Sequence, residues 1–224
     1  MQTTSLKPFP TRQDAGRALA RRLTHFMAAC DTIVLGLPKG GVAVGIEIAR
    51  ILGLPFDVLL VGRITVPGCG DTPLGAITSG GVRMLNCAMI DNLHLTEQDI
   101  REAVLRKSLE LAEREHAYRN ERPSLEVADR NVILVDDGSS SCAILRSAVR
   151  LLRRQHAEKV IVAVPVACHN SACDLRMEAD EFVALAEPAS NVPAAKCFEH
   201  FETPTHDEIR RMLKSAPMDA AYTN

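Results

Sequence analysis

Two short segments of the chain combine residue types that suit the binding of a phosphorylated sugar. In residues 132–145, VILVDDGSSSCAIL, an apolar run leads to Asp136 and Asp137, and Gly138, Ser139, Ser140 and Ser141 follow. A helix that starts after such a run offers free backbone N–H groups, a partial positive charge and hydroxyl donors to a phosphate. The paired carboxylates would repel the phosphate but suit sugar hydroxyls or a divalent cation. This segment therefore predicts a ribose phosphate site, although paired aspartates after a strand also occur as simple helix caps.

The second segment is LGLPKGGVAVG, residues 35–45. Lys39 is a mobile cation that suits phosphate or pyrophosphate. Gly40 and Gly41 allow the backbone to approach a ligand closely or to take a positive φ. Pro-x-Gly-Gly is also an ordinary turn from a strand to a helix, so its meaning depends on where it lies. In a doubly wound sheet, ligands bind at the carboxyl ends of the strands, where the strand order reverses, and we expect the two segments to meet there.

The elements that must position these segments alternate between short apolar runs and helical periodicity. Strands are expected at residues 32–37, 57–62, 131–135, 159–166 and 181–185. Helices are expected from Thr11 as a cap through Ala15, Leu19, Leu23 and Phe26, and at residues 42–52, 96–118, 141–154 and 207–213. Gly80 and Gly81 signal a hairpin between residues 74–79 and 82–90. The pattern predicts an α/β fold: a doubly wound, mostly parallel five-stranded sheet with a small hairpin element, in one domain over residues 1–224.

Composition excludes several classes of protein. The 224 residues include 26 Lys and Arg and 28 Asp and Glu, and this near-neutral balance argues against a nucleic-acid binder. Residues 1–10 lack the apolar core of a signal peptide, and no apolar run is long enough to span a bilayer. The seven cysteines have irregular spacing, so we expect a cytoplasmic protein with reduced thiols. Cys168, His169 and Cys173 lack a second pair of ligands, so no metal site is expected there.

The two segments resemble the phosphoribosyl pyrophosphate motif and the pyrophosphate loop of type I phosphoribosyltransferases. Further stretches in the same order are similar to a group of bacterial phosphoribosyltransferase-like proteins. They are DAGRALARRL (14–23), GLPKGGVAVGIEIAR (36–50), LGAITSGG (74–81), YRNERP (118–123), VAVPVA (162–167) and FEHFETPTHDEI (198–209). The resemblance extends over most of the chain and implies a type I phosphoribosyltransferase-like fold, with a C-terminal hood segment at about residues 186–214.

The resemblance also implies a role for each matching residue. Asp136 and Asp137 would hold the ribose hydroxyls. The 5′-phosphate would lie on the loop of Gly138, Ser139, Ser140, Ser141 and Cys142. Lys39, Gly40 and Gly41 would face the pyrophosphate with its Mg²⁺, and Arg63 would precede a mobile loop at residues 64–75 that closes over the site. The implied reaction is displacement of pyrophosphate from phosphoribosyl pyrophosphate by an unidentified nitrogen acceptor, and homodimers are common in the family.

Three positions of the phosphate loop depart from the family pattern. The family usually has Thr-Gly and then another Thr, where this chain has Ser141, Cys142 and Ile144. Each lost hydrogen bond to a charged group would cost about 1–3 kcal/mol. Ser140 stands where hypoxanthine-guanine phosphoribosyltransferases have a catalytic Asp, which disfavours a 6-oxopurine acceptor.

Three hypotheses about function stay open at this point. The first is a Mg²⁺-dependent phosphoribosyltransferase. The second is a sensor or regulator of the same fold that binds phosphoribosyl pyrophosphate or a nucleotide without turnover. The third is a plain interaction domain, in which the paired aspartates are incidental. A separate hypothesis concerns Cys142, because a thiol at a helix N-terminus tends to have a lowered pKa and to react readily. The favoured alternative is that Cys142 is a small, inert residue.

Overall fold

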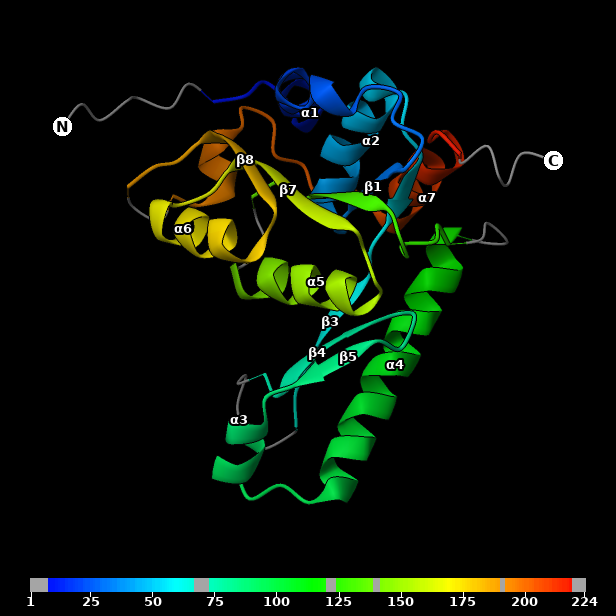
Figure 1. Cartoon of the computed structure of the whole chain (residues 1–224), viewed down its shortest axis with the longest axis vertical. Coiled ribbons are helices and arrows are strands. Elements are labelled where there is room, and N and C mark those ends of the chain that lie inside the picture. Colours follow the sequence, from blue (N-terminus) through cyan, green and yellow to red (C-terminus); the bar gives the residue numbers. More distant parts are fainter. Residues whose placement is uncertain (1–7, 67–72, 120–123, 139–141, 190–191, 219–224) are drawn as a thin grey trace.

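A five-stranded parallel sheet forms the body of the protein in this computed structural model, which describes residues 8–66, 73–119, 124–138, 142–189 and 192–218 (Figure 1). The strands of the sheet are β1 (Thr32–Gly36), β2 (Phe56–Val58), β6 (Asn131–Val135), β7 (Lys159–Val166) and β8 (Glu181–Ala186). Their order is β2-β1-β6-β7-β8, and every neighbouring pair is parallel. The predicted α/β class and the five-stranded sheet are confirmed.

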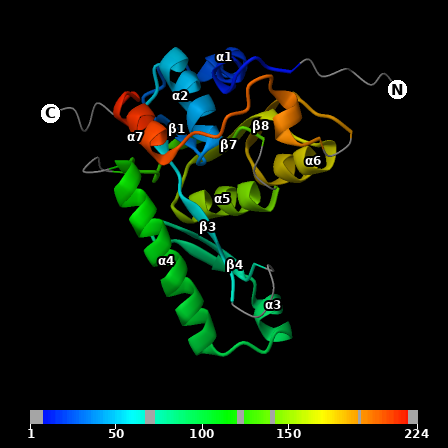
Figure 2. The ribbon, with the colours of Figure 1, turned by 180° about the vertical axis from the view of Figure 1, so that it is seen from behind.

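Helices cover both faces of this sheet (Figures 1 and 2). One face packs on α1 (Arg12–Arg22), α2 (Gly40–Leu52) and α7 (His206–Lys214), and the other on α5 (Cys142–Arg154) and α6 (His169–Glu178). Successive strand side chains point to opposite faces, so one strand supplies both apolar layers. In β6, Ile133 and Val135 belong to the layer under α1 and α2, and Val132 and Leu134 to the layer under α5 and α6.

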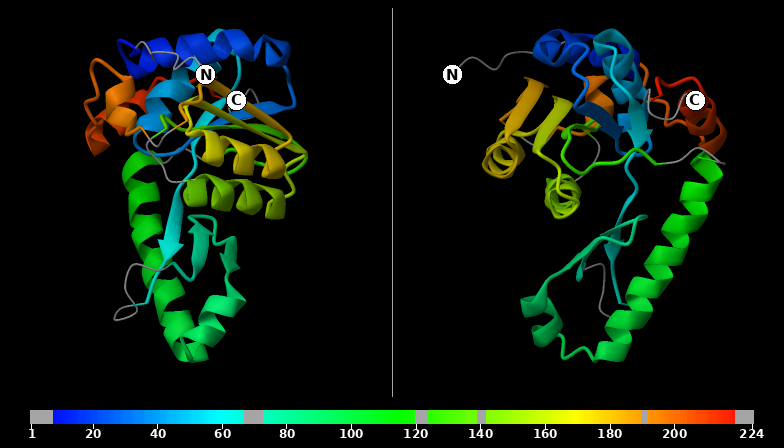
Figure 3. Two further views of the ribbon diagram at one scale, coloured as in Figure 1. Left: turned by 90° about the vertical axis from the view of Figure 1, so that its left-hand side faces the viewer. Right: turned by 45° about the vertical axis from the view of Figure 1, so that its right-hand side comes forward.

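An arm projects from the body between β2 and β6 (Figure 3). Its elements are β3 (Val61–Ile64), β4 (Gly75–Thr78), β5 (Arg83–Leu85), α3 (Cys87–Asn92) and α4 (Glu97–Arg119). The three strands form a separate antiparallel sheet in the order β3-β4-β5. The hairpin expected at Gly80 and Gly81 is confirmed, since β4 and β5 pair on either side of these glycines.

Two expectations about this arm are wrong. The strand expected at residues 57–62 is two strands in different sheets, β2 and β3, because Leu59 and Leu60 between them are buried in different apolar layers. A continuous apolar run gives no sign of such a change of sheet. The second arm of the hairpin ends at Leu85 rather than near residue 90, because the Asn86 side chain accepts a hydrogen bond from the Met89 N–H and caps α3.

The other expected helices and strands lie within two residues of their expected ends, except the first helix, which ends at Arg22 rather than at Phe26. Thr11 caps α1 by accepting a hydrogen bond from the Asp14 N–H. The helix expected from residue 42 begins at Gly40, so both glycines of the second segment belong to α2. Two short 3₁₀ turns, η1 (Thr24–Phe26) and η2 (Ala194–Cys197), complete the elements of the described residues. Within those residues, no helix combines the length and apolarity needed to cross a membrane.

Candidate functional site

The two predicted segments meet at the carboxyl edge of the parallel sheet. β1 and β6 are direct neighbours, with Gly36 opposite Val135, and the Leu37 N–H donates to the Val135 carbonyl oxygen at 2.8 Å. The loops that follow the two strands therefore leave the sheet side by side. The expectation that they adjoin is confirmed, and the peptide bond between Pro38 and Lys39 in the first loop is cis.

Gly40 and Gly41 allow this close contact between the loops. A Cβ atom on Gly41 would overlap the Val135 carbonyl oxygen, and one on Gly40 would overlap the carboxylate of Asp137. Both overlaps are closer than the 3.0 Å that Cβ atoms tolerate. The missing side chains thus leave room for the acidic loop itself. The sequence had suggested instead that these glycines allow a ligand to approach or the backbone to take a positive φ.

The two aspartates point inward rather than into solvent. Asp136 and Asp137 are each 1% exposed, and both have hydrogen-bonding or charged partners within the protein. The Gly138 N–H donates to Asp136 Oδ2 at 2.9 Å, which turns the chain sharply after β6. Gly138 has φ +88°, and a Cβ atom there would lie 2.7 Å from the Val166 carbonyl oxygen, so only glycine fits.

A buried arginine pairs with the second aspartate. Arg12, at the start of α1, is 5% exposed, and its Nε donates to Asp137 Oδ2 at 2.8 Å. Its Nη1 donates to the backbone oxygen of Glu202 at 2.6 Å. The guanidinium carbon lies 4.0 Å from the centre of the Phe201 ring, within the range of a cation–π contact. Arg12 therefore joins the acidic pair to the C-terminal segment.

Sequence reasoning missed Arg12, although a signal was present. Arg12 lies one helical turn before Ala15, on the stripe that continues to Leu19 and Leu23. That stripe is the buried face of α1. Burying a charged residue on an apolar stripe is costly unless an oppositely charged partner pairs with it. The position of Arg12 on this stripe therefore indicated a buried ion pair.

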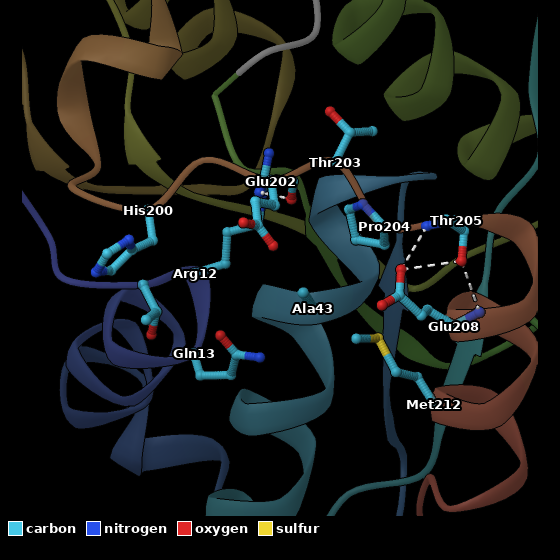
Figure 4. A pocket seen from close by; sticks show the side chains of 11 residues that line it. Arg12, Gln13, Ala43, His200, Glu202, Thr203, Pro204, Thr205, Glu208 and Met212 are labelled. Atoms are coloured by element: carbon cyan, nitrogen blue, oxygen red, sulfur yellow. Dashed lines mark hydrogen bonds between the residues drawn. The ribbon is translucent and has the colours of Figure 1, made fainter.

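A cavity of about 410 Å³ lies beside Arg12, between α1, α2 and α7 (Figure 4). Gln13, His200 and the Glu202 side chain line it on one side, and Pro204 and Met212 on the other. Thr205 and Glu208, also in its wall, bond to each other as the capping box of α7, which holds the pKa of Glu208 below its ordinary value. Arg12 thus both lines the cavity and contacts Asp137.

Two other residues expected at the site, Lys39 and Arg63, lie in different parts of the structure. Lys39 is exposed and immediately precedes α2, beside the acidic loop. Arg63 lies in β3, opposite Ala76 in the antiparallel sheet, where it lines a cavity of about 470 Å³ with Ala143 and Ser147 of α5. Its assignment to the candidate site stays a prediction. Ser139, Ser140 and Ser141, and residues 67–72 of the expected mobile loop, lie outside the described residues.

The surroundings of Cys142 argue against the hypothesis of a reactive thiol and favour a small, inert residue. Cys142 is the first residue of α5, and burial raises the pKa of its thiol above the ordinary value. Among the described cysteines, Cys168 has a lowered pKa, because its Sγ lies 3.0 Å from Ser171 Oγ in a hydrogen bond that favours the thiolate. Both cysteines line a cavity of about 210 Å³ next to Gly138. The six described cysteines are all free.

The fold and the paired loops define a class of protein, and comparison with known families agrees with it. The family described as "Phosphoribosyl transferase domain" matches residues 2–191. The chain therefore belongs to the phosphoribosyltransferase family, and the predicted resemblance to type I members is confirmed.

Individual relatives are similar along nearly the whole chain. The crystal structure of TT1426 from Thermus thermophilus superposes with a TM-score of 0.81 at 32% identity, covering 92% of this chain and 98% of that one. A Mycobacterium tuberculosis protein named "Putative phosphoribosyl transferase", from strains CDC 1551 and H37Rv, is 36% identical over 217 residues. That match covers 96% of this chain but 48% of the relative, so the chain spans about half the length of the curated relatives it matches.

Proposed function

We propose that this chain binds phosphoribosyl pyrophosphate across its two adjoining loops and transfers the phosphoribosyl group to a nitrogen acceptor. In this proposal Asp136 and Asp137 meet the ribose hydroxyls, and the loop from Gly138 to Cys142 holds the 5′-phosphate. Lys39, with the backbone of Gly40 and Gly41, faces the pyrophosphate. The observation that supports the proposal is the direct packing of Gly40 on the Asp137 carboxylate, which brings the two loops against each other. The proposal assigns one of these loops to the pyrophosphate and the other to the ribose.

A Mg²⁺ ion fits this arrangement when it arrives with the substrate. Within the described residues, no group of three or more His, Cys, Asp or Glu side chains could hold a metal ion by itself. Mg²⁺ commonly binds through one or two carboxylates together with substrate phosphates and water. Asp136 and Asp137 are the carboxylates that would hold it here, and its charge would neutralise part of the pyrophosphate.

The chemistry assigned to the chain is positioning and charge stabilisation. The acceptor nitrogen forms a bond to the anomeric carbon, the bond from that carbon to pyrophosphate breaks, and the nitrogen loses a proton. As pyrophosphate leaves, positive charge develops on the sugar ring, and the nearby carboxylates of the acidic pair stabilise it. The Lys39 ammonium stabilises the negative charge on the departing pyrophosphate. Holding the two reactants together lowers the entropic part of the barrier.

Lys39 allows the sharpest test, because its exposed side chain can change without disturbing the core. Calorimetric titration with phosphoribosyl pyrophosphate and Mg²⁺ should show binding to the wild type. Lys39→Met should weaken it about ten- to one-hundredfold, since a hydrogen bond to a charged group contributes about 1.5–3 kcal/mol. Lys159→Met is the matched control, because Lys159 is also exposed but begins β7 at the opposite edge of the sheet. Equal affinity in both variants would rule out the pyrophosphate assignment.

A sensor that binds the same ligand without turnover is the second candidate, and one observation favours it. The Asp137 carboxylate already forms an ion pair with Arg12 inside the protein. The phosphate loop also departs from the family pattern at Cys142 and Ile144. Release of pyrophosphate from bound phosphoribosyl pyrophosphate, on addition of candidate amines and nitrogen bases, separates the two functions. An enzyme releases pyrophosphate only when its acceptor is present, whereas a sensor retains intact ligand throughout.

The remaining expectations stay predictions. They are a homodimer, a cytoplasmic location, a single domain over residues 1–224 with a C-terminal hood at about residues 186–214, and ligands that are small molecules rather than nucleic acid or membrane. The acceptor is unidentified, and the family membership does not name it.

A further inference from the structure

Arg12 is held in one orientation by contacts on several sides. Its Nε and Nη1 donate to different partners, Asp137 Oδ2 at 2.8 Å and the Glu202 backbone oxygen at 2.6 Å. Its guanidinium carbon lies over the Phe201 ring, 4.0 Å from the ring centre, and 5.7 Å from the centre of the Phe198 ring. Figure 4 shows the side chain reaching from the start of α1 to the C-terminal segment. A long flexible side chain that is 5% exposed and contacted in this way has little freedom left.

The position of the Asp137 carboxylate depends on this arginine. Asp136 and Asp137 are adjacent and 1% exposed, and a buried charge is tolerated only when it is paired and hydrogen-bonded. Asp136 accepts from the backbone of its own turn at Gly138, whereas Asp137 pairs with a side chain 125 residues away. The Arg12 Nε donates to Asp137 Oδ2, so the arginine defines the direction of that carboxylate oxygen, while Gly40 lies against the same carboxylate.

We infer that Arg12 is a positioning residue for phosphoribosyl pyrophosphate binding: it orients the Asp137 carboxylate toward the ribose and ties it to the C-terminal segment at Phe201 and Glu202. This inference rests on the proposed function. Arg12 touches no ligand in it and acts only through Asp137. Arginine suits the role because a planar guanidinium donates in two directions while its face stacks on a ring, which a lysine ammonium cannot do.

Three variants separate positioning from stability. Arg12→Met keeps an unbranched, flexible side chain as far as the position of Nε and removes the guanidinium with its donors. Arg12→Lys keeps the positive charge but lacks the planar guanidinium group and its second direction of hydrogen-bond donation. Leu19→Ala is the control: Leu19 is fully buried on the same face of α1, so its truncation destabilises the protein without touching Asp137. Melting temperatures are recorded for each, and affinities for phosphoribosyl pyrophosphate with Mg²⁺ are measured by calorimetry at 15 °C, where folding of each variant is checked first.

We expect the dissociation constant for phosphoribosyl pyrophosphate to rise about tenfold or more in Arg12→Met, because the variant loses charge-assisted hydrogen bonds. The rise should be smaller in Arg12→Lys. In Leu19→Ala the melting temperature should fall while the dissociation constant of the folded protein stays at the wild-type value. Unchanged affinity in Arg12→Met, or an equal loss in Leu19→Ala, overturns the inference. If Arg12→Met does not fold, Arg12→Lys decides, and wild-type affinity there overturns it. Failure of the wild type to bind phosphoribosyl pyrophosphate defeats the proposed function instead, so the two failures are distinguishable.

Discussion

Replacement of Gly40 by alanine tests whether the two loops are packed as tightly as the structure shows. The added Cβ would overlap the Asp137 carboxylate and lie 2.9 Å from Arg12 Nε. Both neighbours are almost fully buried, so neither side chain can swing into solvent. The carboxylate would have to retreat by about 1 Å to restore the 3.0 Å that a Cβ atom tolerates, which moves it within its ion pair with Arg12.

The expected cost combines two opposing effects. Forcing an extra methyl group into a packed site costs about 1–3 kcal/mol, and disturbing a buried ion pair adds to that. Alanine is better than glycine in a helix by about 1 kcal/mol, and Gly40 is the first residue of α2, so part of this gain offsets the overlap. We expect a net loss of about 2 kcal/mol, which lowers the melting temperature by roughly 4–8 °C in a protein of this size.

Thermal unfolding of Gly40→Ala and Gly80→Ala provides the measurement. Gly80 lies in the hairpin turn, and the nearest atoms to an added Cβ are 3.8 Å away, an ordinary van der Waals contact. Gly80→Ala should therefore match the wild type or exceed it slightly, because alanine restricts the unfolded chain. Gly40→Ala should also bind phosphoribosyl pyrophosphate more weakly. The packing argument would be refuted if the melting temperatures of the two variants lay within about 1–2 °C of each other. Such a gap corresponds to a difference of less than about 0.5 kcal/mol in the free energy of unfolding.

Other predictions concern ion pairs and thiols. Arg119→Met should lower the free energy of unfolding by about 3–5 kcal/mol in urea titrations, because it leaves the buried Asp57 carboxylate without its guanidinium partner. A slow alkylating reagent at pH 7.5, followed by peptide mass spectrometry, should modify Cys168 before Cys142, since a hydrogen bond lowers the pKa of the first thiol and burial raises that of the second; the reverse order contradicts both directions. Burial raises the pKa of Glu178, but hydrogen bonds from two arginines outweigh it and hold the pKa below the ordinary 4.5, so this carboxylate stabilises the fold above pH 4.5 and loses that contribution as the pH falls further. Glu178→Gln should therefore be less stable than the wild type at pH 7, with a gap that narrows at pH 3.5, and a gap that does not depend on pH would count against the ion pairs.

Local patterns were sufficient for most of the secondary structure. The strand at Asn131–Val135 and the strand at Lys159–Val166 have the predicted bounds, because a run of β-branched and aliphatic residues must be buried on both faces. The apolar run at residues 57–62 was misread, since burial alone does not say in which sheet a residue is buried. Leu59 and Leu60 belong to different apolar layers, and only the packing of the arm reveals it.

The sequence likewise predicted some features of the candidate site, whereas only the tertiary structure decided others. The sequence alone indicated the α/β class and the two loops, because a turn rich in glycine and an acidic pair after a strand are local features with a local physical cause. The family followed from the resemblance of its motifs to those of known members. Only the tertiary structure decided that Gly40 makes room for Asp137 and that Arg12, 125 residues distant, holds that carboxylate. It also decided that the pKa of the Cys142 thiol is raised rather than lowered, because the desolvation that raises it comes from burial in the folded protein. Burial and charge pairing are properties of neighbours in space, and a pattern along the chain does not contain them.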